Sequence, residues 1–453
     1  MNIYIVREVR CFMKNEIFEN LYLEYEDLKA LADKLLIEDD LTVDWNLELI
    51  EIEENLETYS NFIRVRWQEK VVNQFSKYYK SPPKSQTIYS MWGREIEYGY
   101  ERSIEYNAFE EDIHKSVSEY SGFTLTYSSA MTAFNSLMIF LNDLFLEKFE
   151  ISFVGGYFET VYSLELFKKM NNVIHFFKDE DSMLNYSSTT DVLFLEATKY
   201  NMLLETTDIL HIINNFIKKQ NSLAFIIIDT TLMGDSFPFE KLLKNVGKAN
   251  NIIYINFRSA LKMHQQGFEF SNIGLVSLYY SSSLEPLADK LNKKLKSQRS
   301  IIGSNLSLLE FGLLDAPFFK ESKYFSDNIL SNTKYFAEIL NSSHGDIIKK
   351  VIYPFNSNEY QKTPFIYIIL KENSDLFYKA FIKSIKEELQ RLNISIYERN
   401  SFGFRNISFE YIETVDKNKF RVIKIAPGKI KGVKYHALLD TLIGLSYKEI
   451  NYE

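Results

Sequence analysis

Three short apolar runs in the middle of the chain predict buried strands. They cover residues 191–196, 224–229 and 251–256, and each is apolar almost throughout instead of alternating with polar positions. Strands of this kind are covered on both faces, as in a mostly parallel sheet with flanking helices. Amphipathic stretches separate the runs, so the pattern predicts an α/β fold. Each run ends in a polar residue, and ligands collect at the carboxyl ends of such strands.

The first part of the chain has a different pattern. Between residues 15 and 60 there are 15 acidic residues and two lysines, and leucines recur at helical spacing. This predicts an acidic helical extension that ends near the consecutive prolines Pro82 and Pro83. We interpret the acids as a solvated helix face, with a binding site as the alternative.

The last part of the chain predicts a second, smaller domain. A helix-rich connection over residues 284–340 leads to strand-like segments at 364–370 and 420–426, which indicate an α+β arrangement. A chain of 453 residues also exceeds what one hydrophobic core usually supports. We therefore divide the chain into a helical extension, a large sheet domain and a small C-terminal domain, at residues 1–85, 86–315 and 316–453.

Composition narrows the possible partners. With 46% hydrophobic and 25% charged residues, the chain resembles ordinary globular proteins. A net charge of -9 argues against nucleic acid or an anionic membrane as a partner. No apolar run approaches the roughly 18 residues of a membrane helix, and the first 13 residues carry charges where a signal peptide needs an apolar core. A single cysteine excludes an intramolecular disulfide, so we expect a cytoplasmic protein.

Lys262 and Asp229 carry the clearest chemical meaning. Asp229 ends one apolar run, and Lys262 follows the next run, 33 positions further on. A carboxylate in so apolar a strand favours a cationic partner. A lysine can form a Schiff base with pyridoxal 5′-phosphate (PLP), and a carboxylate can keep the pyridine nitrogen of that cofactor protonated. Arg258 and Ser259, which we place on a loop after the strand, suit a phosphate group.

The segment around the lysine resembles the Cys/Met-metabolism branch of the fold-type-I PLP enzymes, which contains cystathionine synthases and lyases and methionine γ-lyase. Ser259-Ala-Leu-Lys262 is similar to the Ser-x-Thr-Lys motif of that branch, with Leu261 in place of the threonine. The resemblance extends from about residue 98 to the C-terminus. It implies an aspartate aminotransferase-like large domain, PLP as the cofactor, a homodimer or homotetramer, and elimination or replacement at the β or γ carbon of an amino acid.

Two upstream segments resemble further cofactor motifs. Ser129, Ala130 and Met131 resemble a Ser-Gly-Met turn, in which backbone amides at a helix N-terminus hold the phosphate. Tyr157 begins a segment that resembles Tyr-Gly-Gly-Thr, whose tyrosine stacks on the pyridine ring and assists proton transfer. Phe158 and Glu159 stand in place of its two glycines, so the substrate side of the pocket is reshaped.

Weaker matches complete the predicted site. Asn201 lies where the resemblance places an asparagine that binds the ring hydroxyl oxygen, and Tyr100 and Arg102 resemble a pair that reaches the phosphate of the neighbouring subunit. Ser401 and Arg421 resemble the Ser-Leu-Gly and Arg-x-Ser-x-Gly segments, whose arginine grips the substrate α-carboxylate. The alternative, from the residues alone, is that Arg421 is a surface arginine of a strand, paired with a carboxylate.

Two other functions stay open at this point. The same cofactor residues support an aminotransferase or another PLP reaction, and product analysis distinguishes these from elimination. The replacements at Ala130, Phe158 and Leu261 also leave open a catalytically silent PLP-fold protein that acts in binding or regulation.

Overall fold

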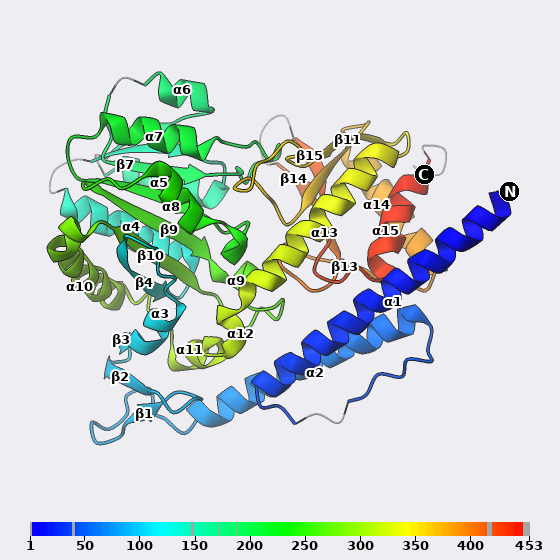
Figure 1. Ribbon diagram of the computed structural model, residues 1–453, viewed down its shortest axis with the longest axis horizontal. Helices are drawn as coiled ribbons and strands as arrows, with labels where there is room; N and C mark the ends of the chain where they lie inside the picture. Colours follow the sequence, from blue (N-terminus) through cyan, green and yellow to red (C-terminus); the bar gives the residue numbers. More distant parts are fainter. Residues whose placement is uncertain are drawn as a thin grey trace.

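The computed structural model describes residues 2–38, 41–145, 149–170, 172–186, 188–414 and 419–446. Two long N-terminal helices lie along one edge of the molecule, beside two separate sheets with their covering helices (Figure 1). Helix α13 (Ser322–Ser343) connects the larger sheet to the smaller one.

Seven strands form the central sheet, in the order β4-β10-β9-β8-β7-β5-β6. The strands are β4 (Ser121–Tyr127), β5 (Glu150–Val154), β6 (Val173–Phe176), β7 (Val192–Glu196), β8 (Ala224–Asp229), β9 (Ile252–Ser259) and β10 (Gly274–Tyr280). Neighbours from β9 to β6 pair in parallel, and only β10 runs antiparallel to both of its neighbours. The mostly parallel sheet confirms the predicted α/β fold.

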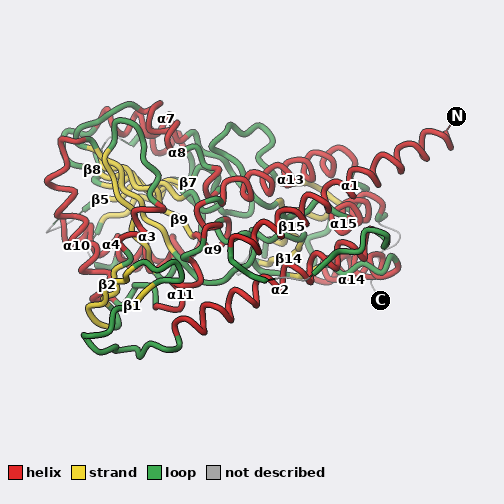
Figure 2. The backbone as a smooth tube through the Cα atoms, turned by 60° about the horizontal axis from the view of Figure 1, so that its bottom comes forward, coloured by secondary structure: helices red, strands yellow, loops and turns green. Residues whose placement is uncertain are grey.

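Helices cover both faces of this sheet, and its strands lie between them in Figure 2. They are α3 (Asn107–Ile113), α4 (Ala130–Leu144), α5 (Phe158–Lys168), α6 (Glu180–Leu184), α7 (Ile209–Lys219), α8 (Phe239–Val246), α9 (Ala260–Met263) and α10 (Glu285–Ile302). Strand β8 shows why its sequence is apolar throughout: Ile226 and Ile228 join one hydrophobic cluster, whereas Phe225 and Ile227 join another. Alternate side chains of a strand point to opposite faces, and both faces are buried here.

A five-stranded sheet in the order β11-β12-β15-β14-β13 forms the C-terminal part. Its strands are β11 (Ile348–Ile352), β12 (Ile366–Leu370), β13 (Tyr397–Glu398), β14 (Ser408–Glu413) and β15 (Arg421–Ala426). Helices α11 (Leu308–Leu314), α12 (Pro317–Lys320) and α13 precede it, and α14 (Asp375–Arg391) and α15 (Val433–Gly444) accompany it. The smaller α+β part is therefore present as the sequence predicted.

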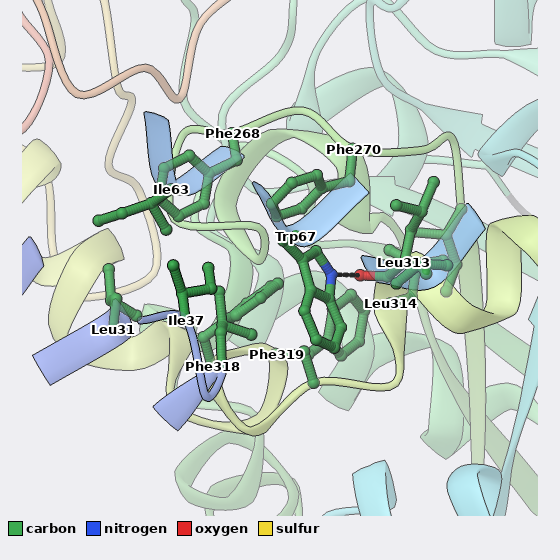
Figure 3. Packing of buried hydrophobic residues seen from close by; sticks show 14 of the residues in the cluster. Leu31, Ile37, Ile63, Trp67, Phe268, Phe270, Leu313, Leu314, Phe318 and Phe319 are labelled. Carbon is green, nitrogen blue, oxygen red and sulfur yellow. Dashed lines mark hydrogen bonds between the residues drawn. The ribbon is translucent and has the colours of Figure 1, made fainter. Parts of the chain in front are cut away.

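The N-terminal part consists of α1 (Asn2–Lys34) and α2 (Leu49–Phe75), followed by a small sheet of β1 (Ile88–Tyr89), β2 (Glu95–Tyr100) and β3 (Ser103–Glu105). Trp67 of α2 is fully buried, and its indole Nε1 donates to the Leu313 carbonyl at 3.0 Å (Figure 3). Phe268 and Phe270, from the loop after α9, pack in the same cluster. The helical extension is thus part of the core and not an appendage on it.

The prediction that the acids of this extension form a solvated face is wrong for several of them. Glu24 and Asp27 pair with Arg405 and Lys429. Glu16 and Glu57 pair with two further lysines, Lys431 at 2.6 Å and Lys434 at 2.5 Å. The acidic pattern is therefore partly an internal interface between the extension and basic residues of the C-terminal part.

Candidate active site

A cavity of about 440 Å³ opens at the carboxyl ends of β7, β8 and β9. Residues of the central sheet and its loops line one side, and residues of the C-terminal part line the other. The lining includes Ser129, Ala130, Met131, Tyr157, Glu159, Glu196, Asp229, Ser259, Lys262, Tyr360, Lys362, Asn400, Ser401 and Phe402. Such a volume suits a small organic ligand, and the position is the usual binding site of a parallel sheet.

Lys262 lies on the short helix α9, directly after β9. Its Nζ donates to Ser401 Oγ at 2.5 Å and lies 5.9 Å from the centre of the Phe402 ring. Burial lowers the pKa of the Lys262 ammonium, although the nearby Glu269 carboxylate opposes the change. A larger share of this lysine is therefore the neutral, nucleophilic amine than for a surface lysine.

Asp229 and Glu196 end neighbouring strands and lie opposite each other in the sheet register. Burial raises the pKa of Asp229 to about 6, against a hydrogen bond from the Thr231 N–H at 2.8 Å. Burial and the charge of Asp229 raise the pKa of Glu196 to about 7. A cation bound beside Asp229 would favour its ionised form.

The two carboxylates differ in their hydrogen bonds. Glu196 accepts from the N–H groups of Gly156 and Tyr157, each at 3.0 Å, and of Tyr200 at 2.9 Å. It therefore fixes the loop that carries Tyr157. Asp229 is bonded only by Thr231 among the described residues, through the Thr231 N–H at 2.8 Å and its side chain, and it lines the cavity.

The other end of the cavity offers hydrogen-bond donors. Ser129 caps helix α4, and its Oγ accepts from the Thr132 N–H at 3.1 Å. Ala130 and Met131 follow at the first positions of this 15-residue helix, where N–H groups have no intrahelical partner. Together with the hydroxyl of Ser259, they form a place for an anion. A Cβ atom at Gly274 would lie 2.4 Å from the Ser129 carbonyl oxygen, so the close approach of β10 to this turn requires glycine.

Tyr157 and Glu159 lie at the start of α5. The Tyr157 hydroxyl donates to Glu159 Oε2 at 2.7 Å, and the Tyr157 ring contacts the Tyr200 ring edge-on with centroids 5.4 Å apart. Burial, and then the Glu159 carboxylate, hold the pKa of the Tyr157 phenol well above its usual range. The Tyr157 phenol is therefore protonated at neutral pH, and it donates its hydrogen bond to Glu159.

Arg258 lies away from the cavity, and the expectation that it belongs to a loop is wrong. Strand β9 extends through Ser259, so Arg258 and Ser259 point to opposite faces of the sheet. Ser259 lines the cavity, whereas the Arg258 guanidinium pairs with buried Asp235 at 3.0 Å and donates to the Gly234 carbonyl at 3.3 Å.

Asn201 and Arg421 are also absent from the described lining of the cavity. The Asn201 amide donates to Glu205 at 2.9 Å, and its oxygen accepts from the Leu203 N–H at 3.0 Å, so it closes a turn. Arg421 begins β15, where its Nε donates to Glu413 at 2.7 Å and its Nη1 donates to the Asn373 carbonyl at 2.7 Å. This is the carboxylate pairing that the residues alone had left open.

Tyr100 ends strand β2 of the small N-terminal sheet, and Arg102 lies in the turn between β2 and β3. Tyr100 is exposed, and the Arg102 guanidinium lies 5.5 Å from the centre of the Tyr100 ring. Their side chains reach no part of the cavity within the described residues of this single chain. A role across a subunit interface therefore stays a prediction.

Several lining residues were not predicted from the sequence as site residues. Lys362 and Asn400 reach the cavity from loops of the C-terminal part, and Thr231 reaches it from the loop after β8. No motif marks Lys362 or Asn400. The strand-end position of Glu196, however, could have identified it beside Asp229.

The donor set fits the cofactor that the sequence resemblance implies. A lysine amine, a strand-end carboxylate and a helix N-terminus surround one cavity. Two further buried hydroxyls in its lining, Thr160 Oγ1 and Thr198 Oγ1, have no hydrogen-bond partner among the described residues. Buried polar atoms are usually paired, so these atoms are consistent with a site for a polar ligand.

Comparisons with known proteins agree with the fold. No family model matches the sequence, and no curated protein matches it significantly. Among solved structures, the methionine γ-lyase CalE6 from Micromonospora echinospora matches with a TM-score of 0.57 and 13% identity, over 83% of this chain and 98% of that one. Cystathionine γ-synthase from Xanthomonas oryzae pv. oryzae matches with a TM-score of 0.56 and 14% identity, over 84% and 96%.

A third structure, MetB from Corynebacterium glutamicum, has a TM-score of 0.57 and 17% identity, over 83% of this chain and 97% of that one. The chain therefore has the fold of the Cys/Met-metabolism enzymes, as the sequence resemblance implied. At these identities the likeness establishes the fold alone, because one fold can carry many different chemistries.

Proposed function

We propose that this protein is a PLP-dependent enzyme that eliminates or replaces a group at the β or γ carbon of an amino acid. The observation that carries the proposal is one cavity that joins the half-buried Lys262, the strand-end Asp229 and the N-terminus of α4. These three features match the aldehyde, the ring nitrogen and the phosphate of PLP. The names of the structures with this fold, a γ-lyase and a γ-synthase, support the choice of reaction.

PLP bound here would supply an electron sink that stabilises a carbanion at Cα of the substrate. Lys262 would hold the cofactor before substrate arrives, and its liberated amine would take the Cα proton. Ser401 holds the lysine Nζ on the side of the C-terminal part. Asp229 would keep the ring nitrogen protonated, because the carboxylate anion and the protonated ring nitrogen each favour the charged form of the other.

Tyr157 and Glu159 would act on the leaving group. The Tyr157 phenol stays protonated and is held by Glu159; it would donate a hydrogen bond to the departing atom, while its raised pKa keeps the proton itself on Tyr157. The family glycines are replaced at this point, so the group accepted here should differ from that of the structural neighbours.

Two cations are candidates for the substrate carboxylate. Arg421 was predicted from the sequence, but it pairs with Glu413 outside the cavity lining. Lys362 lines the cavity and has an exposed side chain. We favour Lys362, because its ammonium is available to an anion that enters the cavity.

Two further properties belong to this proposal. The exposed Tyr100 and Arg102 support at least a homodimer, in which they reach the phosphate site of the neighbouring subunit. Cytoplasmic location stays part of the proposal, and none of the described helices is long and apolar enough to cross a bilayer.

Reduction of the PLP-loaded protein with borohydride tests the proposal. We expect the pyridoxyl label on Lys262 in peptide mapping, with Lys199, a fully buried lysine, as the internal control. A label elsewhere, or none in PLP-saturated protein, would refute the assignment. A panel of β- and γ-substituted amino acids then separates the reactions: a keto acid with ammonia indicates elimination, and pyridoxamine phosphate indicates amino transfer.

A further inference from the structure

Two loops meet at the backbone of Lys262. The first, residues 264–270, follows α9 and has positive φ at Gln266, Gly267 and Glu269. The second, residues 401–405, comes from the C-terminal part. Gly403 has φ +86°, and a Cβ atom there would lie 1.9 Å from the Lys262 carbonyl oxygen. The second loop thus lies directly against the backbone of Lys262, and its position sets where the Lys262 amine meets Ser401.

Arg405 connects these loops. Its side chain is 4% exposed, and its Nη1 donates to the Gln266 carbonyl at 2.9 Å. A Cβ atom at Gly267 would lie 2.8 Å from the Arg405 nitrogen, so the two backbones touch. The guanidinium also lies 5.6 Å from the centre of the Phe268 ring.

Helix α1 holds the other side of the Arg405 guanidinium. The Nε atom donates to Glu24 at 2.5 Å, and Nη2 donates to Asp27. Lys429 Nζ donates to both acids at 2.6 Å. Two acids and two bases therefore form a neutral, largely buried cluster. Burial alone would raise the pKa of Asp27, but the charges of Arg405 and Lys429 lower it to about 2, so the carboxylate is ionised.

Helix α2 contacts the first of the two loops, residues 264–270. Phe268 and Phe270 pack in the cluster that contains Ile63 and Trp67 (Figure 3), and Arg64 Nε donates to the Phe268 carbonyl at 2.8 Å. Both N-terminal helices thus contact the residues that immediately follow the lysine. The extension is placed to act on the active-site loops.

We infer that Glu24, Asp27 and Arg405 are positioning residues, through which the N-terminal helices hold the two loops in the arrangement that places Lys262 against Ser401. The inference rests on the proposed function only in that Lys262 carries the cofactor. It assigns a role to the acidic extension: removal of its charges should disturb the active-site lysine and not only stability.

The test compares the double variant Glu24→Gln/Asp27→Asn with Glu57→Gln in the full-length PLP-loaded enzyme. Glu57 pairs with Lys434, so the control also breaks an ion pair between the extension and the C-terminal part, away from Lys262. We expect the double variant to exchange backbone hydrogen faster over residues 262–270. We also expect its cofactor absorbance to titrate at a different pH and its kcat to fall about 10- to 100-fold with a smaller change in KM, as small misplacements of catalytic groups do.

The control should lower the melting temperature and change neither the exchange nor the titration. If the double variant matches the control in all readouts, the cluster is structural only and the inference is wrong.

If the double variant does not fold, Arg405→Lys replaces it, because this change keeps the charge but removes the fork that reaches both Gln266 and α1. Normal exchange over 262–270 in Arg405→Lys would likewise overturn the inference. Failure of PLP to label Lys262 in the wild type would refute the proposed function, while the exchange measurement would still decide whether Glu24, Asp27 and Arg405 position the two loops.

Discussion

Asp229→Asn should make the cofactor-free protein more stable and the enzyme much less active. The folded structure raises the pKa of Asp229 from 3.8 to about 6, so the ionised carboxylate is disfavoured in the empty cavity. The cost is absent below pH 3.8, grows as the pH rises and is complete above pH 6. A pKa difference of about 2.2, at about 1.4 kcal/mol for each unit, gives at most about 3 kcal/mol, and solvent in the cavity reduces this figure.

Asparagine removes this cost and keeps the local hydrogen bond. Its side-chain oxygen can still accept from the Thr231 N–H. The kcat/KM of the PLP-loaded enzyme should fall, because the protonated ring nitrogen of the cofactor would no longer have the Asp229 carboxylate beside it. Breaking one partner of a buried charge pair costs about 3–5 kcal/mol, which corresponds to a fall in kcat/KM of about a hundred- to several-thousand-fold.

The assay is thermal unfolding of cofactor-free protein at pH 5 and pH 8, together with kcat/KM of the PLP-loaded enzyme. We expect the melting temperature of Asp229→Asn to exceed that of the wild type at pH 8, and the gain to shrink at pH 5. Asp191→Asn is the control: Asp191 accepts from the Glu150 N–H at 2.9 Å at the opposite end of the sheet, so activity should not change. A destabilised Asp229→Asn with normal kcat/KM would refute the reasoning.

Two other predictions concern the substrate and the subunit interface. Lys362→Ala should lower kcat/KM at least about tenfold for amino acids but not for their decarboxylated analogues. Arg421→Ala should lower the melting temperature and leave kcat/KM near normal. The opposite result would show that Arg421, and not Lys362, binds the substrate carboxylate. Arg102→Ala and Lys262→Ala, each inactive alone, should regain part of the activity when mixed, because one hybrid site carries neither change. Verified mixed dimers without activity would exclude a shared site.

Much of the fold was predictable because burial leaves a local pattern. The runs that became β7, β8 and β9 are apolar throughout, since both of their faces are covered, and the helical spacing of leucines marked α1. Most of the predicted site residues line one cavity, although the sequence showed only their order along the chain. They are Lys262, Asp229, Ser259, Ser129, Ala130, Met131, Tyr157 and Ser401. Strand ends and helix starts place such residues at one edge of a sheet, so their convergence follows from the element pattern.

The sequence by itself determined the α/β architecture, the acidic helical extension and the residues at the carboxyl edge of the sheet. Tertiary structure alone decided the direction of individual side chains: strand β9 continues to Ser259, which turns Arg258 away from the cavity, and Arg421 pairs with Glu413. It also decided that Glu24 and Asp27 are internal, because the basic residues that receive them lie nearly 400 positions away in the chain. Local periodicity reports which face of an element is apolar, but the partner of a charge depends on which distant elements pack together.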